Sequence, residues 1–248
     1  MPDSTTKLAE KRIAYGAGVL APRDWTVQPQ LDYPAYGSTR LRRPTQALVP
    51  IEPTLSELTG PFVTPSPLAH VDSDLTRNGR VDGEPIGERI VVSGRVLDER
   101  GKPIPRTLIE VWQANAAGRY AQRTDKHDAP LDPNFYGSGR CITDNEGAYS
   151  FTSIRPGPYP WSNHYNAWRP AHIHVSLFGP CFATRLITQF YFPGDPLLDL
   201  DPIFNATPAR AQNRLIARYS LATSQPNRAM GYEFDIVLRG ADATPMEV

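Results

Sequence analysis

The sequence predicts an all-β protein: a β-sandwich core of mixed and antiparallel strands, with long loops, one short helix and an extended N-terminal arm. The first observation is a series of short runs rich in β-branched and aromatic residues, at fairly regular spacing from residue 89 onward. The second is that 26 prolines and 18 glycines are spread along the whole chain, while 40% of residues are hydrophobic. This composition indicates many turns in a packed domain rather than disorder.

The first 85 residues differ from the rest of the chain. They are spaced by prolines and show few periodic elements, apart from a short helical turn expected near Leu55–Leu58. So long a segment without regular structure is unusual inside a compact domain. We therefore expect residues 1–85 to be an arm that packs on the core and on a partner subunit, and residues 86–248 to be the sandwich core.

The core elements follow in order. The expected strands cover residues 90–98, 107–113, 141–143, 149–154, 171–178, 184–192 and 232–238. A turn at 99–103 makes the second strand the return of the first, and the turn 144–147 joins the third and fourth as a hairpin. Residues 209–219 are the expected helix, because apolar residues recur at helical spacing and Pro208 stands near its first turn.

Charge and cysteine content exclude several classes of function. Lys and Arg total 26 and Asp and Glu total 26, so no overall field favours nucleic acid or an anionic membrane. Cys141 and Cys181 are too few for a disulfide framework or a metal cluster and are expected to be reduced core residues. Reduced cysteines are typical of a cytoplasmic protein, which we expect here. The sequence shows neither an apolar leader nor a run long enough to span a membrane.

The strand expected at 171–178 carries the chemistry around which the chain is organised. Side chains alternate along a strand, so His172 and His174 point to one face and Ile173 to the other. Two imidazoles on one rigid face suit a metal ion. A His-x-His pair alone is a weak signal, and it is strengthened by its polar and aromatic neighbours, namely Tyr159, Trp161, Trp168 and Arg169.

Two histidines do not complete a metal site. One carboxylate would indicate Fe(II), and another His or a Cys would indicate zinc or copper, but neither completion is evident in the sequence. Two tyrosines are well placed: Tyr159, in a proline-fixed loop, and Tyr120, at the end of the strand carrying Trp112. Ionising a tyrosine at pH 7 costs about 4 kcal/mol, which a ferric ion offsets. The residues alone leave open that this pair merely packs in the core.

Several motifs resemble one known family. They are EPIGERIVVSGRV (84–96), LIEVWQANAAGRY (108–120), LDPNFYGSGRCITD (131–144), IRPGPYPW (154–161), WRPAHIHVSL (168–177), LITQFYFPGDPL (186–197) and FDIVLRG (234–240). Over about residues 30–240 the chain closely resembles the intradiol ring-cleaving dioxygenases. The resemblance implies a non-haem Fe(III) cofactor.

The resemblance also implies a role for each site residue. The Fe(III) ligands would be Tyr120, Tyr159, His172 and His174. The catalytic residues would be Arg169 beside the substrate ring, Gln189 as its hydrogen-bonding support, and Tyr159 as a base once the substrate displaces it. The substrate contacts would be Tyr36, Trp161 and Ile203, with Trp112 as a further candidate. For Trp112 and Trp161, stacking on the substrate ring and ordinary core packing both remain open. Ser162 stands where relatives often have arginine, so carboxylate recognition is expected to differ.

The reaction that the resemblance implies is cleavage of protocatechuate (3,4-dihydroxybenzoate) by O2 to 3-carboxy-cis,cis-muconate, within the β-ketoadipate pathway of aromatic catabolism. Relatives that act on catechol, chlorocatechol or hydroxyquinol carry a helical N-terminal segment, whereas residues 1–85 here are proline-spaced. This difference favours the two-subunit branch, with a homologous α subunit that lacks the iron ligands. The alternatives are a dioxygenase for another catechol, or a transthyretin-like β-sandwich that only binds.

Overall fold

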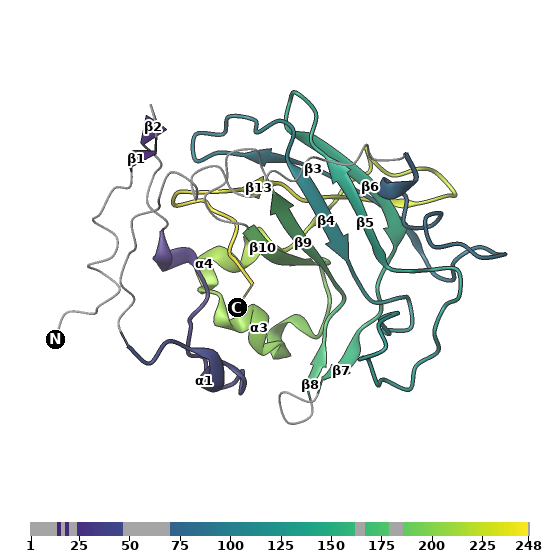
Figure 1. Ribbon diagram of the computed structural model, residues 1–248, viewed down its shortest axis with the longest axis horizontal. Helices are drawn as coiled ribbons and strands as arrows, with labels where there is room; N and C mark the ends of the chain where they lie inside the picture. The colour runs from purple at the N-terminus through teal and green to yellow at the C-terminus, as the bar shows by residue number, and fades with distance from the viewer. Residues whose placement is uncertain are drawn as a thin grey trace.

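The computed structural model describes residues 14–15, 18–19, 24–46, 70–161, 167–178 and 186–247. Two β-sheets pack face to face, and short helices lie beside one of them near the end of the chain (Figure 1). The predicted all-β sandwich is confirmed. No helix among these residues is long and apolar enough to cross a membrane.

The first sheet has the order β10-β9-β4-β5 and is antiparallel throughout. Its strands are β4 (Leu108–Trp112), β5 (Ser138–Ile142), β9 (His172–Phe178) and β10 (Leu186–Tyr191). Strand β9 is central and pairs on both edges, so its register is fixed from two sides. The predicted histidine strand is therefore confirmed, and it is one of the two inner strands of the sheet.

The second sheet is mixed and is built around β3 (Arg89–Leu97). On one edge β3 pairs antiparallel with β6 (Ala148–Ile154), and on the other it pairs in parallel with β12 (Met230–Glu233) and β13 (Ile236–Val237). The two-residue β11 (Arg218–Tyr219) pairs antiparallel with β12. A side chain at Gly94 would meet the Phe234 carbonyl, so glycine permits the close approach where the predicted strand 232–238 is broken in two.

The hydrophobic core fills the space between the two sheets. Ile109, Ile173 and Phe190 from the first sheet are completely buried against Val92 and Ile236 from the second. On β9 the alternate residues face this core, so the histidines lie on the opposite face of the same sheet. The core thus supports the back of the candidate site.

Two predicted hairpins are wrong, although their turns form. The turn at 144–147 closes with Gly147 at φ +69°, but β5 pairs with β4 and β6 pairs with β3. Likewise β4 is not the return of β3, because the two strands lie in different sheets. Both turns carry the chain across the sandwich, since the apolar faces of these strands pack face to face and their edges pair elsewhere.

The predicted single helix at 209–219 is also wrong. Helix α4 covers only Ala209–Gln212, a 3-10 turn η5 follows at Asn213–Leu215, and the chain then becomes extended. The Ala217 amide donates to the Tyr191 carbonyl at 2.9 Å, so pairing with the end of β10 replaces the helical hydrogen bonds. The two helical segments just before it are short as well: η4 (Leu198–Leu200) and α3 (Pro202–Ala206).

The described part of the predicted arm forms turns and short helices and is not extended. Residues 24–46 contain η2 (Trp25–Val27), a series of turns and α1 (Thr39–Arg42). The earlier elements are β1 (Ala14–Tyr15), paired with β2 (Gly18–Val19), and the core is entered through η3 (His70–Ser73). The arm contacts the core where the Gln30 amide donates to the Ala206 carbonyl at 3.1 Å.

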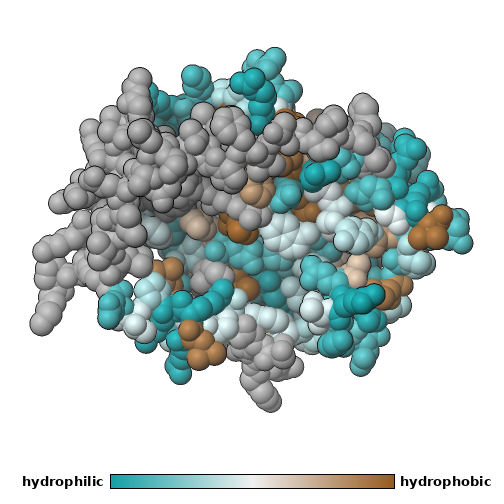
Figure 2. Space-filling view, in the orientation of Figure 1, coloured by the Kyte–Doolittle hydropathy of each residue, from teal (hydrophilic) through white to brown (hydrophobic). Residues whose placement is uncertain are grey.

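Some predictions fall on residues outside this description: the turn near Leu55–Leu58, Cys181 and Ser162. Cys141 is buried and free, as expected, and burial raises the pKa of its thiol to about 12. On the visible face of the molecule, hydrophobic residues are scattered among hydrophilic ones and form no broad patch outside the grey regions (Figure 2).

Candidate active site

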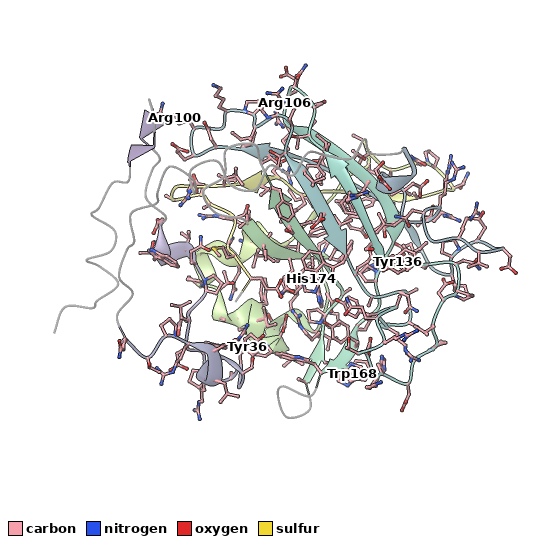
Figure 3. All side chains as sticks on the ribbon, viewed as in Figure 1. Tyr36, Arg100, Arg106, Tyr136, Trp168 and His174 are labelled. Carbon is pink, nitrogen blue, oxygen red and sulfur yellow. The ribbon has the colours of Figure 1, made fainter. Side chains whose placement is uncertain are left out.

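The two histidines share the outer face of the first sheet. Their rings lie 4.8 Å apart at 82°, and both side chains are buried. In the neighbouring strands Trp112 and Gln189 pair with His174, and Tyr191 pairs with His172, so these side chains form one continuous surface. Figure 3 shows His174 near the centre of the view, among closely spaced side chains.

A two-stranded hairpin, β7 (Tyr159–Trp161) with β8 (Ala167–Arg169), brings Tyr159 to this surface. The register sets Tyr159 opposite Arg169, and alternation along the strands puts both side chains on the face directed at the histidines. Trp168 takes the opposite face and is 45% exposed. The sequence prediction had Tyr159 in a proline-fixed loop; the structure places it in a short strand.

Tyr120 comes from the connection after β4, eight residues beyond the end of that strand rather than at its end. The backbone amide of Tyr120 donates to the Asp125 carboxylate at 2.8 Å. Gly118, at φ +80°, lies so close to the Pro158 carbonyl that a β-carbon would be 2.1 Å from it. Glycine at this position therefore lets the Tyr120 loop pack directly against the residue preceding Tyr159.

The four side chains converge in two pairs. The Tyr120 hydroxyl lies 3.2 Å from Nε2 of His174, and the Tyr159 hydroxyl lies 3.3 Å from Nε2 of His172. The two phenol rings pack edge to face with centroids 5.6 Å apart. The structure therefore brings together all four residues predicted as metal ligands.

Hydrogen bonds fix how each imidazole is presented. Nδ1 of His172 lies 2.7 Å from the Pro170 carbonyl, and Nδ1 of His174 lies 3.0 Å from the Glu247 carboxylate. A carbonyl only accepts, so Nδ1 of His172 carries the proton and Nε2 carries the lone pair. Arg169 supports this assignment, because its Nη1, which only donates, lies 3.3 Å from the same Nε2. Burial, with the charges of Arg169 and His174, holds the pKa of His172 well below its usual value.

The donor set fits a metal ion. Bonds of about 2.0–2.1 Å to a common ion separate neighbouring donor atoms by about 3.0–3.4 Å, and the tyrosine–histidine distances of 3.2 and 3.3 Å fall in that range. Burial raises the pKa of Tyr120 well above its usual value and also raises that of Tyr159, although Arg169 opposes the second shift. Only a strongly charged cation offsets the cost of ionising such phenols. Among the described residues, no group of three or more His, Cys, Asp or Glu offers an alternative metal site.

A buried polar network holds Arg169 beside these ligands. Arg169 is 3% exposed and its Nη2 donates to the Asp201 carboxylate at 3.0 Å. The Tyr191 hydroxyl accepts from the same Nη2 at 3.3 Å and donates to Asp201 at 2.9 Å. Gln189 was predicted to support Arg169, and its Nε2 donates to the Tyr191 hydroxyl at 2.6 Å. Its link to Arg169 therefore passes through Tyr191.

The predicted substrate contacts lie around this centre. Tyr36 packs edge to face on Trp161 at 5.1 Å, and the Arg169 guanidinium lies 5.6 Å above the Trp161 ring. Ile203 is buried in the first turn of α3, two residues after the Asp201 cap. Trp112 stacks flat on His174 at 4.9 Å, so it contacts a predicted ligand whatever its role toward substrate.

Sequence reasoning missed three residues of the site: Tyr191, Asp201 and Glu247. Asp201-Pro202 is a helix-start signal, an N-cap followed by proline, and it could have revealed α3. Tyr191 stands two residues after Gln189 and so shares its face of β10. Glu247 gave no such signal, because it reaches His174 from 73 residues away.

Comparisons with known proteins identify the family to which the chain is similar. The family described as "Dioxygenase" matches residues 58–240, and the "Protocatechuate 3,4-dioxygenase beta subunit N terminal" family matches residues 21–54. The protocatechuate 3,4-dioxygenase beta chain of Burkholderia cepacia is 59% identical over 229 residues, which cover 92% of this chain and 97% of that one.

More distant relatives share the core. Catechol 1,2-dioxygenase of Candida albicans is 36% identical over 61% of this chain and 51% of its own. The solved 3-chlorocatechol 1,2-dioxygenase of Rhodococcus opacus 1CP superposes with a TM-score of 0.53 at 25% identity, covering 68% of this chain and 65% of that structure. The chain therefore belongs to the intradiol ring-cleavage dioxygenases, a family of non-haem iron enzymes, and within it to the protocatechuate 3,4-dioxygenase beta chains.

Proposed function

We propose that the chain binds Fe(III) through Tyr120, Tyr159, His172 and His174, and cleaves protocatechuate with O2 to 3-carboxy-cis,cis-muconate. The observation that carries the proposal is the convergence of two phenol oxygens on two imidazole Nε2 atoms whose Nδ1 atoms are already hydrogen-bonded. Neutral imidazole and phenolate together suit a hard, highly charged ion. When bound, the ferric ion acts as a Lewis acid that activates a catechol for attack by dioxygen.

The surrounding residues bind the substrate and move its protons. Tyr159, whose hydroxyl lies next to His172, is the phenol that we expect the substrate to displace, so that its oxygen accepts a catechol proton. Arg169 is a fixed cation on the same side, and it stabilises negative charge that develops on the ring. Gln189 acts through the Tyr191 hydroxyl that both residues contact.

The substrate ring is proposed to lie between Trp161 and Ile203, with Tyr36 near its carboxylate. Support comes from the contact of Tyr36 with Trp161 and from the Arg42 guanidinium, 4.7 Å above the Tyr36 ring. A carboxylate on the substrate suits this cationic neighbourhood. Arg42 thus offers a positive charge even though Ser162 replaces the arginine expected at that position. Trp112 is proposed to orient His174 by stacking.

We further propose that a homologous α subunit completes the enzyme and that residues 1–85 are the arm that contacts it, with residues 86–248 as the catalytic core. The support is the beta-chain relative and the matched beta-subunit N-terminal family. We place the activity in the cytoplasm, because the described cysteine is a free, buried thiol. A second candidate substrate is another catechol, since relatives named for catechol and hydroxyquinol share the core.

The decisive experiment combines metal analysis with visible absorption on the chain purified with its α partner. We expect about one iron per chain, a tyrosinate-to-iron charge-transfer band, and a shift of that band on anaerobic addition of protocatechuate. Oxygen uptake with protocatechuate, catechol and hydroxyquinol then identifies the substrate. A preparation that stays colourless after ferric reconstitution would overturn the proposal.

A further inference from the structure

The histidine pair is held by two different kinds of acceptor. His172 lies against the neutral carbonyl of Pro170, only two residues away in the same segment. His174 lies against the Glu247 carboxylate, which comes from the far end of the described chain. The side chains of His174 and Glu247 are 10% and 22% exposed, so this contact is largely shielded from water.

The segment that carries Glu247 is tied to the sheet beside the histidines. The Glu247 amide donates to the Ile187 carbonyl at 2.9 Å, and the Thr188 hydroxyl donates to the Pro245 carbonyl at 2.7 Å. The Met246 amide donates to the side chain of Gln28 at 2.8 Å. The carboxylate is therefore delivered by a fixed backbone that contacts both β10 and the N-terminal arm.

A charged acceptor changes what an imidazole does at a metal. Supporting carboxylates orient a ligating histidine, fix its tautomer and make its other nitrogen a better donor. A neutral carbonyl fixes the tautomer with less effect on donor strength, because charge-assisted hydrogen bonds are about twice as strong as neutral ones. The two histidines are thus unequal in the surroundings that support them.

We infer that Glu247 is a positioning residue for His174: it holds the imidazole with Nε2 directed at the ligand cluster and strengthens it as an iron ligand. The inference rests on the proposed function, because it assigns a role toward the proposed ferric site. The 244–247 segment would then support the metal site as well as pack on the sheet. The hydrogen bond between the Met246 amide and the Gln28 side chain connects the N-terminal arm to this segment.

The test compares Glu247→Gln, Glu247→Ala and the control Glu146→Ala, whose side chain lies on the exposed 144–147 turn. Iron release to a chelator is followed by the decay of the charge-transfer band. We expect Glu247→Ala to release iron about 10–100-fold faster than wild type, with a shifted band. Glu247→Gln keeps a neutral acceptor of the same size, so it should fall between wild type and Glu247→Ala. Glu146→Ala should match wild type.

The outcomes separate the two proposals. If wild type itself holds no iron after ferric reconstitution, the proposed function fails. If wild type holds iron and both Glu247 variants release it at the rate of the control, only the role of Glu247 fails. Thermal unfolding of the metal-free proteins identifies a variant that has lost its fold. Should Glu247→Ala not fold, Glu247→Gln decides, and release at the wild-type rate with an unshifted band would overturn the inference.

Discussion

The histidines and the tyrosines of the site reach the same point from different kinds of structure. His172 and His174 lie on β9, an inner strand of a four-stranded sheet, with paired strands on both sides and the hydrophobic core behind. Tyr159 lies on a two-stranded hairpin outside both sheets, and Tyr120 lies in a loop. One half of the site is thus set by strand register and the other by packing between separate segments.

The difference also extends to electrostatics. The pKa of His172 is lowered by burial and by Arg169, so this histidine is neutral and ready to bind a metal without losing a proton. The tyrosines must lose their protons to bind a metal, and burial makes this harder because it raises the pKa of both phenols. The sheet half is therefore prepared for a cation in advance, whereas the tyrosine half depends on the cation's charge.

The largest expected effect tests the sheet half. His172→Ala removes a buried imidazole that is 2% exposed. The Tyr159 hydroxyl then has no imidazole nitrogen beside it, and only three of the four proposed ligands remain. We expect the iron content to fall below the detection limit of metal analysis. Removal of a residue that only supports a ligand lowers metal affinity about 10–100-fold, and loss of a ligand should lower it further. His127→Ala is the matched control, because that histidine contacts the Gly118 carbonyl and Trp168 instead. Equal iron in the two variants would contradict the proposed ligand.

The next effect concerns the ion pair that holds Arg169 on the hairpin. Asp201→Asn keeps an oxygen that can cap α3 but leaves a buried guanidinium without its counter-charge. We expect a loss of about 3–5 kcal/mol in the free energy of unfolding, measured with urea. Asp242→Asn breaks the pair with Arg214 at the surface, where the Asp242 side chain is 89% exposed, and should cost at most about 1 kcal/mol. Similar losses in both variants would show that the buried pair has no special role.

Proton release tests the tyrosine half. At pH 8 the metal-free protein keeps Tyr120 and Tyr159 protonated, because both pKa values lie above the usual value of about 10. Ferric binding should therefore release about two protons from these side chains, and Tyr159→Phe should release about one fewer. Calorimetry in buffers of different ionisation enthalpy gives the number. An unchanged number in Tyr159→Phe would remove Tyr159 from the ligand set.

The same shifts predict how stability depends on pH in the metal-free chain. The unfolded tyrosines lose protons as pH rises through about 10, while the folded ones still hold theirs. The unfolded state then binds fewer protons, so the free energy of unfolding falls as pH increases above about 10. Urea unfolding between pH 8 and 11 checks the sign, and Tyr120→Phe should weaken the dependence.

The smallest effect compares the two faces of the hairpin. Trp161 faces Tyr36 and Arg169, so Trp161→Ala should raise the KM for protocatechuate by up to about tenfold, corresponding to about 0.5–1.5 kcal/mol. Trp168 faces outward, and Trp168→Ala should change KM by no more than about twofold. Steady-state oxygen uptake measures both. A larger effect from Trp168 would mean that the outer face of the hairpin also contributes to the site.

Several features could be predicted from residues close together in the chain. Alternation places His172 and His174 on one face in any strand, whichever sheet contains it. The turn at 144–147 followed from its glycine and its Asp and Asn residues, and the structure confirms the turn. What failed was the pairing of the strands around it, because strand partners are chosen by packing across the whole sandwich.

The sequence by itself determined the sandwich class, the histidine face of β9 and, through its motifs, the ligand set proposed here. Only the tertiary structure decided which groups support those ligands. Asp201 meets Arg169 across 32 residues and Glu247 meets His174 across 73, and neither contact has a local pattern. The physical reason is that alternation along a strand sets the directions of side chains only over a few residues. Hydrogen bonds between distant segments depend on how the two sheets, the β7–β8 hairpin and the 244–247 segment pack together.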